Sequence, residues 1–291
     1  MPGITNEVIV SAQMQWLIKD LATVDDKSAP LLSECTVIYL HKSSLDIDGN
    51  QTSSIEMVNG SQLISALQEF TNVHVLTGHT HINFNVQSGS TLIEHNTAAV
   101  SATWWWTGKS GYAGNHICKD GSPGGYGIWE IDGSEVQWYY KGSGKPADYQ
   151  FRSYDLNECH ITAAEYAPNS TDEALAPYAG TYANSNTGNE VLINVWGYDP
   201  ECTVEVSEGG IPLEVNRVTA KDPLHIISYE AMRLNAGAIP TSSFVTGNTS
   251  HMFKVVASAP NTTLEIKVTD RFGNIYTESM SRPKQLSYLM N

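Results

Sequence analysis

Hydrophobic and polar positions in the first 80 residues follow first a helical and then a strand-like period. Apolar residues recur every three or four positions in 11–24 and in 60–70, which predicts two amphipathic helices. Short apolar runs at 35–40 (CTVIYL) and 72–78 (NVHVLTG) predict buried strands. A strand, a helix and a second strand in this order form a βαβ unit, whose right-handed crossover makes the two strands parallel.

From about residue 85 the pattern changes to short strands separated by turns. Asp132-Gly133 stands between two segments of alternating apolar residues, which predicts a β-hairpin. We expect the apolar side chains of the two arms to face one another: Trp129 and Ile131 against Val136, Trp138 and Tyr140.

The remaining sequence divides at a stretch rich in Ala, Pro, Ser, Thr, Asn and Gly, which predicts a linker or irregular connection at 157–188. Beyond it, short strand candidates recur at regular spacing, as is typical of an immunoglobulin-like β-sandwich. The sequence therefore predicts an α+β protein with an α/β unit at 1–156 and a β-sandwich at 189–291.

The composition limits the classes of partner. Lys and Arg number 16 against 31 Asp and Glu, and the net charge is -15. A nucleic-acid surface or an anionic membrane surface needs clustered positive charge, so neither is expected. No apolar run approaches the length of a membrane span. An anionic substrate would need a local positive centre, such as a metal ion.

Three histidines are predicted to meet at one edge of the sheet. His79 and His81 follow the strand at 72–78, and His41 follows the strand at 35–40. Parallel strands place their carboxyl ends at the same edge, where open α/β sheets bind their ligands. Two histidines one residue apart are more often surface or hydrogen-bonded residues, but a third that arrives independently favours a metal site. Three imidazoles suit Zn, Fe or Mn better than Mg or Ca.

The same segments carry a resemblance to a known family. Gly78-His79-Thr80-His81, Tyr39-Leu40-His41 and Gln13-x-x-Trp16-Leu17 resemble the closing motifs of the calcineurin-like metallophosphoesterases. The resemblance extends to Bacteroides-type members with an appended C-terminal domain through further segments: AVSATWWWTG, KDGSPGGYGIWEIDG, WYYKGSG, YQFRSYDL and DRFGNIYTE.

The resemblance implies a two-metal site that hydrolyses phosphate esters. The two ions would be divalent or trivalent Mn, Fe or Zn, with a metal-bound water attacking phosphorus. By motif position, His41 and His79 would bind one metal ion and His81 the other. Residues 1–156 would then form the C-terminal half of the phosphoesterase domain.

The sequence departs from the family pattern in one large respect. Family members carry D-x-H, G-D-x-x-D and G-N-[HDE] motifs before the region matched here, and the chain contains neither a D-x-H nor a Gly-Asp dipeptide. We expect the N-terminal half of the catalytic domain to be missing, and the chain alone to be weakly active or inactive. Gly114-Asn115-His116 spells the third motif, but it follows the GHTH segment and we interpret it as a coincidence.

Two further features have both a structural and a functional interpretation. His95 follows a strand close to the GHTH segment, and we favour a hydrogen-bonded structural histidine over a ligand. Trp104, Trp105 and Trp106 could line a substrate site, but packing between the two parts of the chain is the simpler interpretation.

An alternative function is a non-catalytic module that uses its β-sandwich to bind a glycan or a protein, which rests on fold-level analogy. A missing half would leave an open sheet edge, and a second copy or a complementary chain could cover it. The family resemblance suggests a periplasmic or extracellular location.

Overall fold

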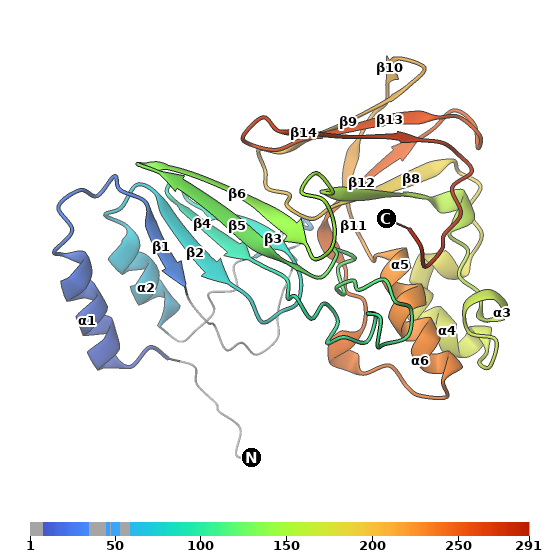
Figure 1. The fold of residues 1–291 in the computed structure, drawn as a ribbon, viewed down its shortest axis with the longest axis horizontal. Helices are drawn as coiled ribbons and strands as arrows, with labels where there is room; N and C mark the ends of the chain where they lie inside the picture. The colour runs from blue at the N-terminus through green and yellow to red at the C-terminus, as the bar shows by residue number, and fades with distance from the viewer. Residues whose placement is uncertain (1–7, 35–44, 47, 53–58, 291) are drawn as a thin grey trace.

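The fold is known from a computed structural model that describes residues 8–34, 45–46, 48–52 and 59–290. Figure 1 shows a small α/β layer beside a larger body of two sheets and several helices, with the hairpin β5–β6 lying along the small layer. This mixture of helices, one mostly parallel sheet and several antiparallel sheets confirms the predicted α+β class. The predicted strand at 35–40 and His41 lie outside the described residues.

The small layer is a four-stranded sheet with two helices packed on one face (Figure 1). β1, β2 and β4 are parallel and β3 is antiparallel to β4. β1 ends just before the predicted strand at 35–40, so the predicted pairing of that strand with 72–78 is not tested by the described residues. Apolar side chains of both helices and of β2 and β4 form the core. The elements are α1 (Ser11–Leu21), β1 (Leu31–Glu34), α2 (Gly60–Leu67), β2 (Val73–Thr77), β3 (Phe84–Ser88) and β4 (Leu92–Asn96).

The predicted hairpin is present as β5 (Gly125–Asp132) and β6 (Glu135–Gly142), with Trp129 opposite Trp138. Gly133 has a φ of 61°, which the turn requires and glycine adopts at little cost. The ring of Trp138 lies edge-on to His74 of β2 and His95 of β4. The hairpin therefore covers the face of the small sheet that the helices leave open.

The larger body is a β-sandwich of two four-stranded sheets. One has the order β10-β9-β13-β14 and the other β11-β12-β8-β7, and all their pairings are antiparallel. Apolar side chains from both sheets meet in one core. The strands are β7 (Phe151–Asp155), β8 (Glu190–Val195), β9 (Thr203–Glu208), β10 (Ile211–Pro212), β11 (Asn216–Ala220), β12 (Thr249–Val256), β13 (Leu264–Thr269) and β14 (Ile275–Met280).

A layer of short helices packs on the other face of the β11-β12-β8-β7 sheet (Figure 1). Residues 157–188, for which the sequence predicts a linker or irregular connection, supply two of these helices and several fully buried side chains, including Leu175. Short helical turns with many small residues give little periodic signal, although they pack into a core. The helices are α3 (Ala163–Tyr166), α4 (Asp172–Ala179), α5 (Pro223–His225), a π-helical turn (Ile226–Ala231) and α6 (Met232–Asn235).

The segment after β14 closes this helical core. Leu286 and Met290 are buried in it. Arg282 Nη2 donates to Asp155 Oδ1 of β7 at 2.9 Å, and both side chains are fully buried. Across the described ranges, no helix is long and apolar enough to cross a bilayer.

Candidate functional site

The GHTH loop, residues 78–81, leaves the carboxyl end of β2 at the edge where the parallel strands of the small sheet end. Neighbouring β4 holds the loop in place, because Asn96 Nδ2 donates to Thr80 Oγ1 at 2.5 Å and to the carbonyl of Ile82 at 2.7 Å. Thr97 N donates to the carbonyl of Thr77 at 2.9 Å. The loop is therefore fixed at the sheet edge that the sequence predicts for the site.

Backbone strain is concentrated around this loop. His79 and His81 have φ values of 73° and 57°, in the left-handed region that non-glycine residues seldom adopt. Left-handed φ values recur in the loop between β4 and β5, at Ala102, Trp104, Trp105 and His116. Such conformations cost of order 1–3 kcal/mol each and cluster at functional sites. The strain thus points to these two loops as a candidate site.

His81 is held in one orientation and one tautomer. Its Nδ1 lies 2.5 Å from the carbonyl oxygen of Ala102, and because a carbonyl only accepts, Nδ1 carries the proton. The ring stacks on Trp104 at a centroid distance of 3.7 Å, and Trp104 stacks in turn on Phe244 at 4.1 Å. Burial lowers the pKa of His81, so its Nε2 keeps a lone pair at neutral pH. A backbone carbonyl that fixes the ring through its other nitrogen is the usual support of a metal-binding histidine.

The donors around the loop do not form a complete metal site in the described part of the chain. His79 is exposed beside His81, but His41 is among the residues that the structure does not describe. Within the described ranges, no group of three or more His, Cys, Asp or Glu side chains is placed to hold a metal ion. His79 and His81 fit a metal as two donors, and a complete centre would need further donors.

The three consecutive tryptophans have different environments. Trp104 packs between the GHTH loop and Phe244 of the larger body, while Trp105 is 57% exposed and Trp106 is 36% exposed. Trp105 stacks on His116, whose Nε2 donates to the carbonyl of Val100 at 2.5 Å. His116 therefore makes structural contacts within its own loop. Trp104 therefore packs between the two parts of the chain, as the simpler interpretation of the three tryptophans expects.

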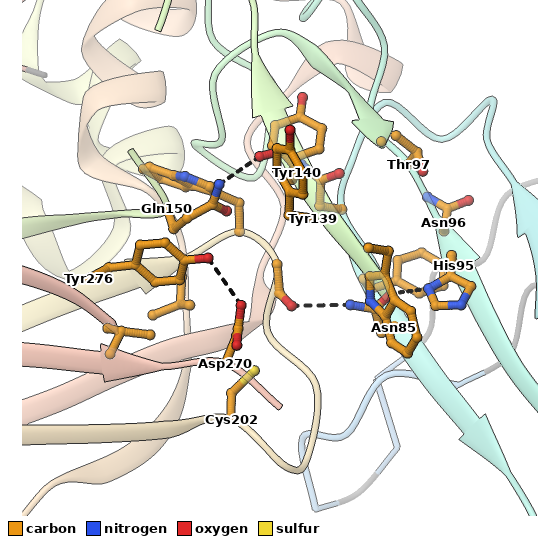
Figure 2. Close-up of a pocket in the computed structure, with 18 of the residues that line it drawn as sticks. Asn85, His95, Asn96, Thr97, Tyr139, Tyr140, Gln150, Cys202, Asp270 and Tyr276 are labelled. Atoms are coloured by element: carbon orange, nitrogen blue, oxygen red, sulfur yellow. Dashed lines mark hydrogen bonds between the residues drawn. The ribbon is translucent and has the colours of Figure 1, made fainter. Parts of the chain in front are cut away.

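His95 belongs to a hydrogen-bonded chain rather than to the GHTH loop (Figure 2). Its Nε2 lies 2.9 Å from His74 Nδ1, and its Nδ1 lies 2.8 Å from Asn85 Oδ1. Asn85 Nδ2 donates to the carbonyls of Gly197 and Tyr198 in the larger body, both at 3.2 Å. Burial lowers the pKa of His74 to about 4 and that of His95 to about 3, so both rings are neutral at pH 7.

The space beside His95 is a cavity of about 50 Å³ between the small sheet, the hairpin and the sandwich. Figure 2 shows its polar wall, in which Tyr276 Oη donates to Asp270 Oδ2 and Gln150 donates to the carbonyl of Tyr140. A cavity of this size holds one or two water molecules at ~30 Å³ each and is too small for a substrate. The aromatic rings and the histidine chain therefore form an interface between the two parts of the chain.

A comparison with known protein families finds a match over much of the chain. The model of the C terminal of calcineurin-like phosphoesterase matches residues 94–276, which is more than half of the chain. The chain belongs to the calcineurin-like phosphoesterase C-terminal domain family. Neither curated proteins nor solved structures give a match to this chain.

The segment that matches this C-terminal domain family begins within β4 and ends within β14. It includes the loop with Trp104, the hairpin and nearly all of the sandwich, and the GHTH loop precedes it. Sequence reasoning missed Phe244, which stacks on Trp104, and Lys119, whose charge acts on His81. Phe244 lies about 140 positions from Trp104, and no local pattern signals such a contact.

Proposed function

We propose that the protein is a metal-dependent phosphoesterase to whose dinuclear centre this chain contributes His41, His79 and His81. Membership of the calcineurin-like phosphoesterase C-terminal domain family supports the reaction class. Enzymes of this wider family generally use two metal ions, which supply positive charge and an activated water molecule. In a strongly acidic chain, with a net charge of -15, such a centre would supply the positive charge that an anionic ester needs.

The support of His81 is the observation that carries the proposal. The Ala102 carbonyl fixes the proton on Nδ1, the Trp104 ring fixes the plane of the imidazole, and the left-handed backbone turns the residue away from the strand direction. Together these contacts present Nε2 in a single direction and exclude water from one face of the ring. A histidine with only a structural role would not require strained backbone in both loops that hold it.

The described residues of this chain would position the metal-binding histidines. Asn96 fixes the loop through Thr80 and Ile82, and Trp104 fixes His81. The upstream carboxylate motifs of the family are not in the sequence, so we expect little or no hydrolysis of a generic phosphate ester by this chain alone. Robust metal-dependent hydrolysis that is lost in His79→Ala would contradict that expectation.

Metal content tests the proposed centre directly. The purified 291-residue protein would be incubated with Mn²⁺ or Zn²⁺, desalted and measured by inductively coupled plasma mass spectrometry. We expect retained metal that is lost in His79→Ala and in His81→Ala. His160→Ala is the matched control, because His160 is an exposed histidine in the larger body. Equal retention by all four proteins, or none by the wild type, would refute a metal site at the GHTH loop.

A further inference from the structure

A second pocket lies beside the GHTH loop, on the side of the larger body. It has a volume of about 130 Å³. Ile82, next to His81, forms one side, and Lys119 and Asp120 of the loop between β4 and β5 form another. The third side is the segment before β12, which includes Ser242, Ser243 and Asn248. Three chain segments far apart in the sequence thus converge on one small polar space.

Lys119 is the cation of this pocket, and some of its N–H donors have no acceptor among the residues that the structure describes. Its side chain is half-buried, and its Nζ makes one long hydrogen bond, 3.5 Å to the carbonyl of Ser243. The described residues place no carboxylate within ion-pair distance of Nζ. An ammonium group carries three N–H donors, so at least two remain for a ligand. Burial lowers the pKa of Lys119 and outweighs the nearby charge of Asp120, which raises it.

The carboxylate of Asp120 makes no direct ion pair with this lysine, because its oxygens are bound elsewhere. Oδ1 accepts from the backbone N–H and the hydroxyl of Ser122, at 3.0 and 2.7 Å. Oδ2 accepts from the backbone N–H of Asn83 at 2.6 Å and lies 3.4 Å from His251 Nε2. The charge of Asp120 still acts on the ammonium, but the N–H donors of Lys119 remain available to a ligand.

The size and the lining restrict the ligand. A volume of 130 Å³ is the share of about four water molecules at ~30 Å³ each, which suits a tetrahedral oxyanion but not a nucleotide. The hydroxyls of Ser242 and Ser243 and the amide of Asn248 are donors that suit anion oxygens, as does a lysine ammonium. Lys119 is partly buried and makes no direct ion pair in the described part of the chain, so its donors are available to an anion.

We propose that this pocket, with Lys119 as its cation, binds the phosphate group of a substrate or product beside the GHTH loop. Lys119 and His81 are close enough for the lysine charge to disfavour protonation of the imidazole. Phe244 follows Ser243 of the pocket wall and stacks on Trp104, so it connects the wall to the ring that holds His81. The role of the bound phosphate as a substrate group rests on the proposed phosphoesterase function, whereas binding of the oxyanion does not.

Calorimetric titration of metal-free protein with inorganic phosphate tests this site. The full chain would be treated with a chelator, so that phosphate binding is measured apart from metal binding. We expect Lys119→Met to weaken phosphate binding on the order of tenfold or more, since it removes a charge-assisted contact while keeping the apolar stem. Lys119→Arg keeps the charge and should retain binding. Lys109→Met is the control, because Lys109 is an exposed lysine of the same loop.

The outcomes separate this inference from the proposed function. Phosphate binding that depends on Lys119 but not on Lys109 supports the pocket, whether or not the protein retains metal. Phenyl phosphate in place of inorganic phosphate distinguishes an ester site from a site for free phosphate. No binding by wild type at roughly 10 mM phosphate, or equal binding by Lys119→Met, would overturn the inference even if the GHTH loop binds metal.

Discussion

The buried histidine chain makes a specific prediction about stability at mildly acidic pH. In the folded protein burial lowers the pKa of His95 to about 3, against an ordinary value of 6.5. Between these values the unfolded chain binds a proton at this position and the folded chain does not. Stability is therefore full above pH 6.5 and is lost as the pH falls toward 3. At pH 5 the loss from this histidine is about 2 kcal/mol relative to pH 7.5, from 1.36 kcal/mol per pH unit.

The assay compares the wild type with His95→Gln by urea unfolding at pH 7.5 and pH 5. Gln keeps an acceptor for the proton on His74 Nδ1 and removes the titrating ring. Other titrating groups contribute to both proteins and cancel in the difference. The fall in unfolding free energy between the two pH values should be about 2 kcal/mol smaller in His95→Gln. His160→Gln, at an exposed position, should fall by as much as the wild type.

A different proton count would refute this reasoning. Asn85 Oδ1 accepts from His95 Nδ1, and Asn72 Oδ1 lies 2.9 Å from His74 Nε2. If both amide oxygens accept from the rings, the contact between His74 Nδ1 and His95 Nε2 needs a further proton, and the pair is then cationic. The folded pair would in that case hold one proton throughout, whereas the two unfolded histidines hold fewer than one above pH 6.5 and more than one below it. Stability would then rise as the pH falls from 7.5 to 6.5 and fall at lower pH. A rise between pH 7.5 and 6.5 that disappears in His95→Gln would establish the cationic pair.

Three further substitutions test packing that the fold depends on. Trp104→Ala removes the ring between His81 and Phe244, and urea unfolding should show a loss of about 2–3 kcal/mol; no change would mean that the stack is not stabilising. Arg282→Ala leaves a buried carboxylate unpaired at Asp155 and should cost about 3 kcal/mol or more, whereas a value below 1 kcal/mol would argue that water reaches the pair. Gly121→Ala combines a φ of 84° with a clash at a buried carboxylate, so thermal unfolding should show a loss of about 2 kcal/mol or more, and an unchanged midpoint would contradict the tight fit.

Local pattern predicted the elements whose buried side chains are apolar. The helices at 11–24 and 60–70 are present as α1 and α2, and the hairpin follows from Asp132-Gly133. β7 gave no strand signal, because its five residues are all buried and include Arg152 and Asp155. Their polar groups are satisfied by partners far along the chain, which a short window cannot contain.

In the candidate site, too, local sequence pattern predicted some features and missed those that depend on distant residues. The end of β2 and the Gly-His-Thr-His segment could be placed at a sheet edge from the order of the elements alone. The contacts that orient His81 could not, because Ala102 and Trp104 lie in an irregular loop with left-handed backbone. The Lys119 pocket depends on Ser243, more than 100 positions away. Long-range packing of irregular segments leaves no periodic trace in sequence.

The buried pair Asp155–Arg282 also determines when the larger body can fold during synthesis. Its two residues are 127 positions apart, and Leu286 and Met290 join the core that α3 and α4 begin. A ribosome needs on the order of ten seconds to add that many residues. During that interval, Leu286 and Met290 are not yet available to cover the side of the β7–β8 pair that faces the helices. We therefore expect nascent chains to depend on chaperones until residues 282–290 have left the exit tunnel.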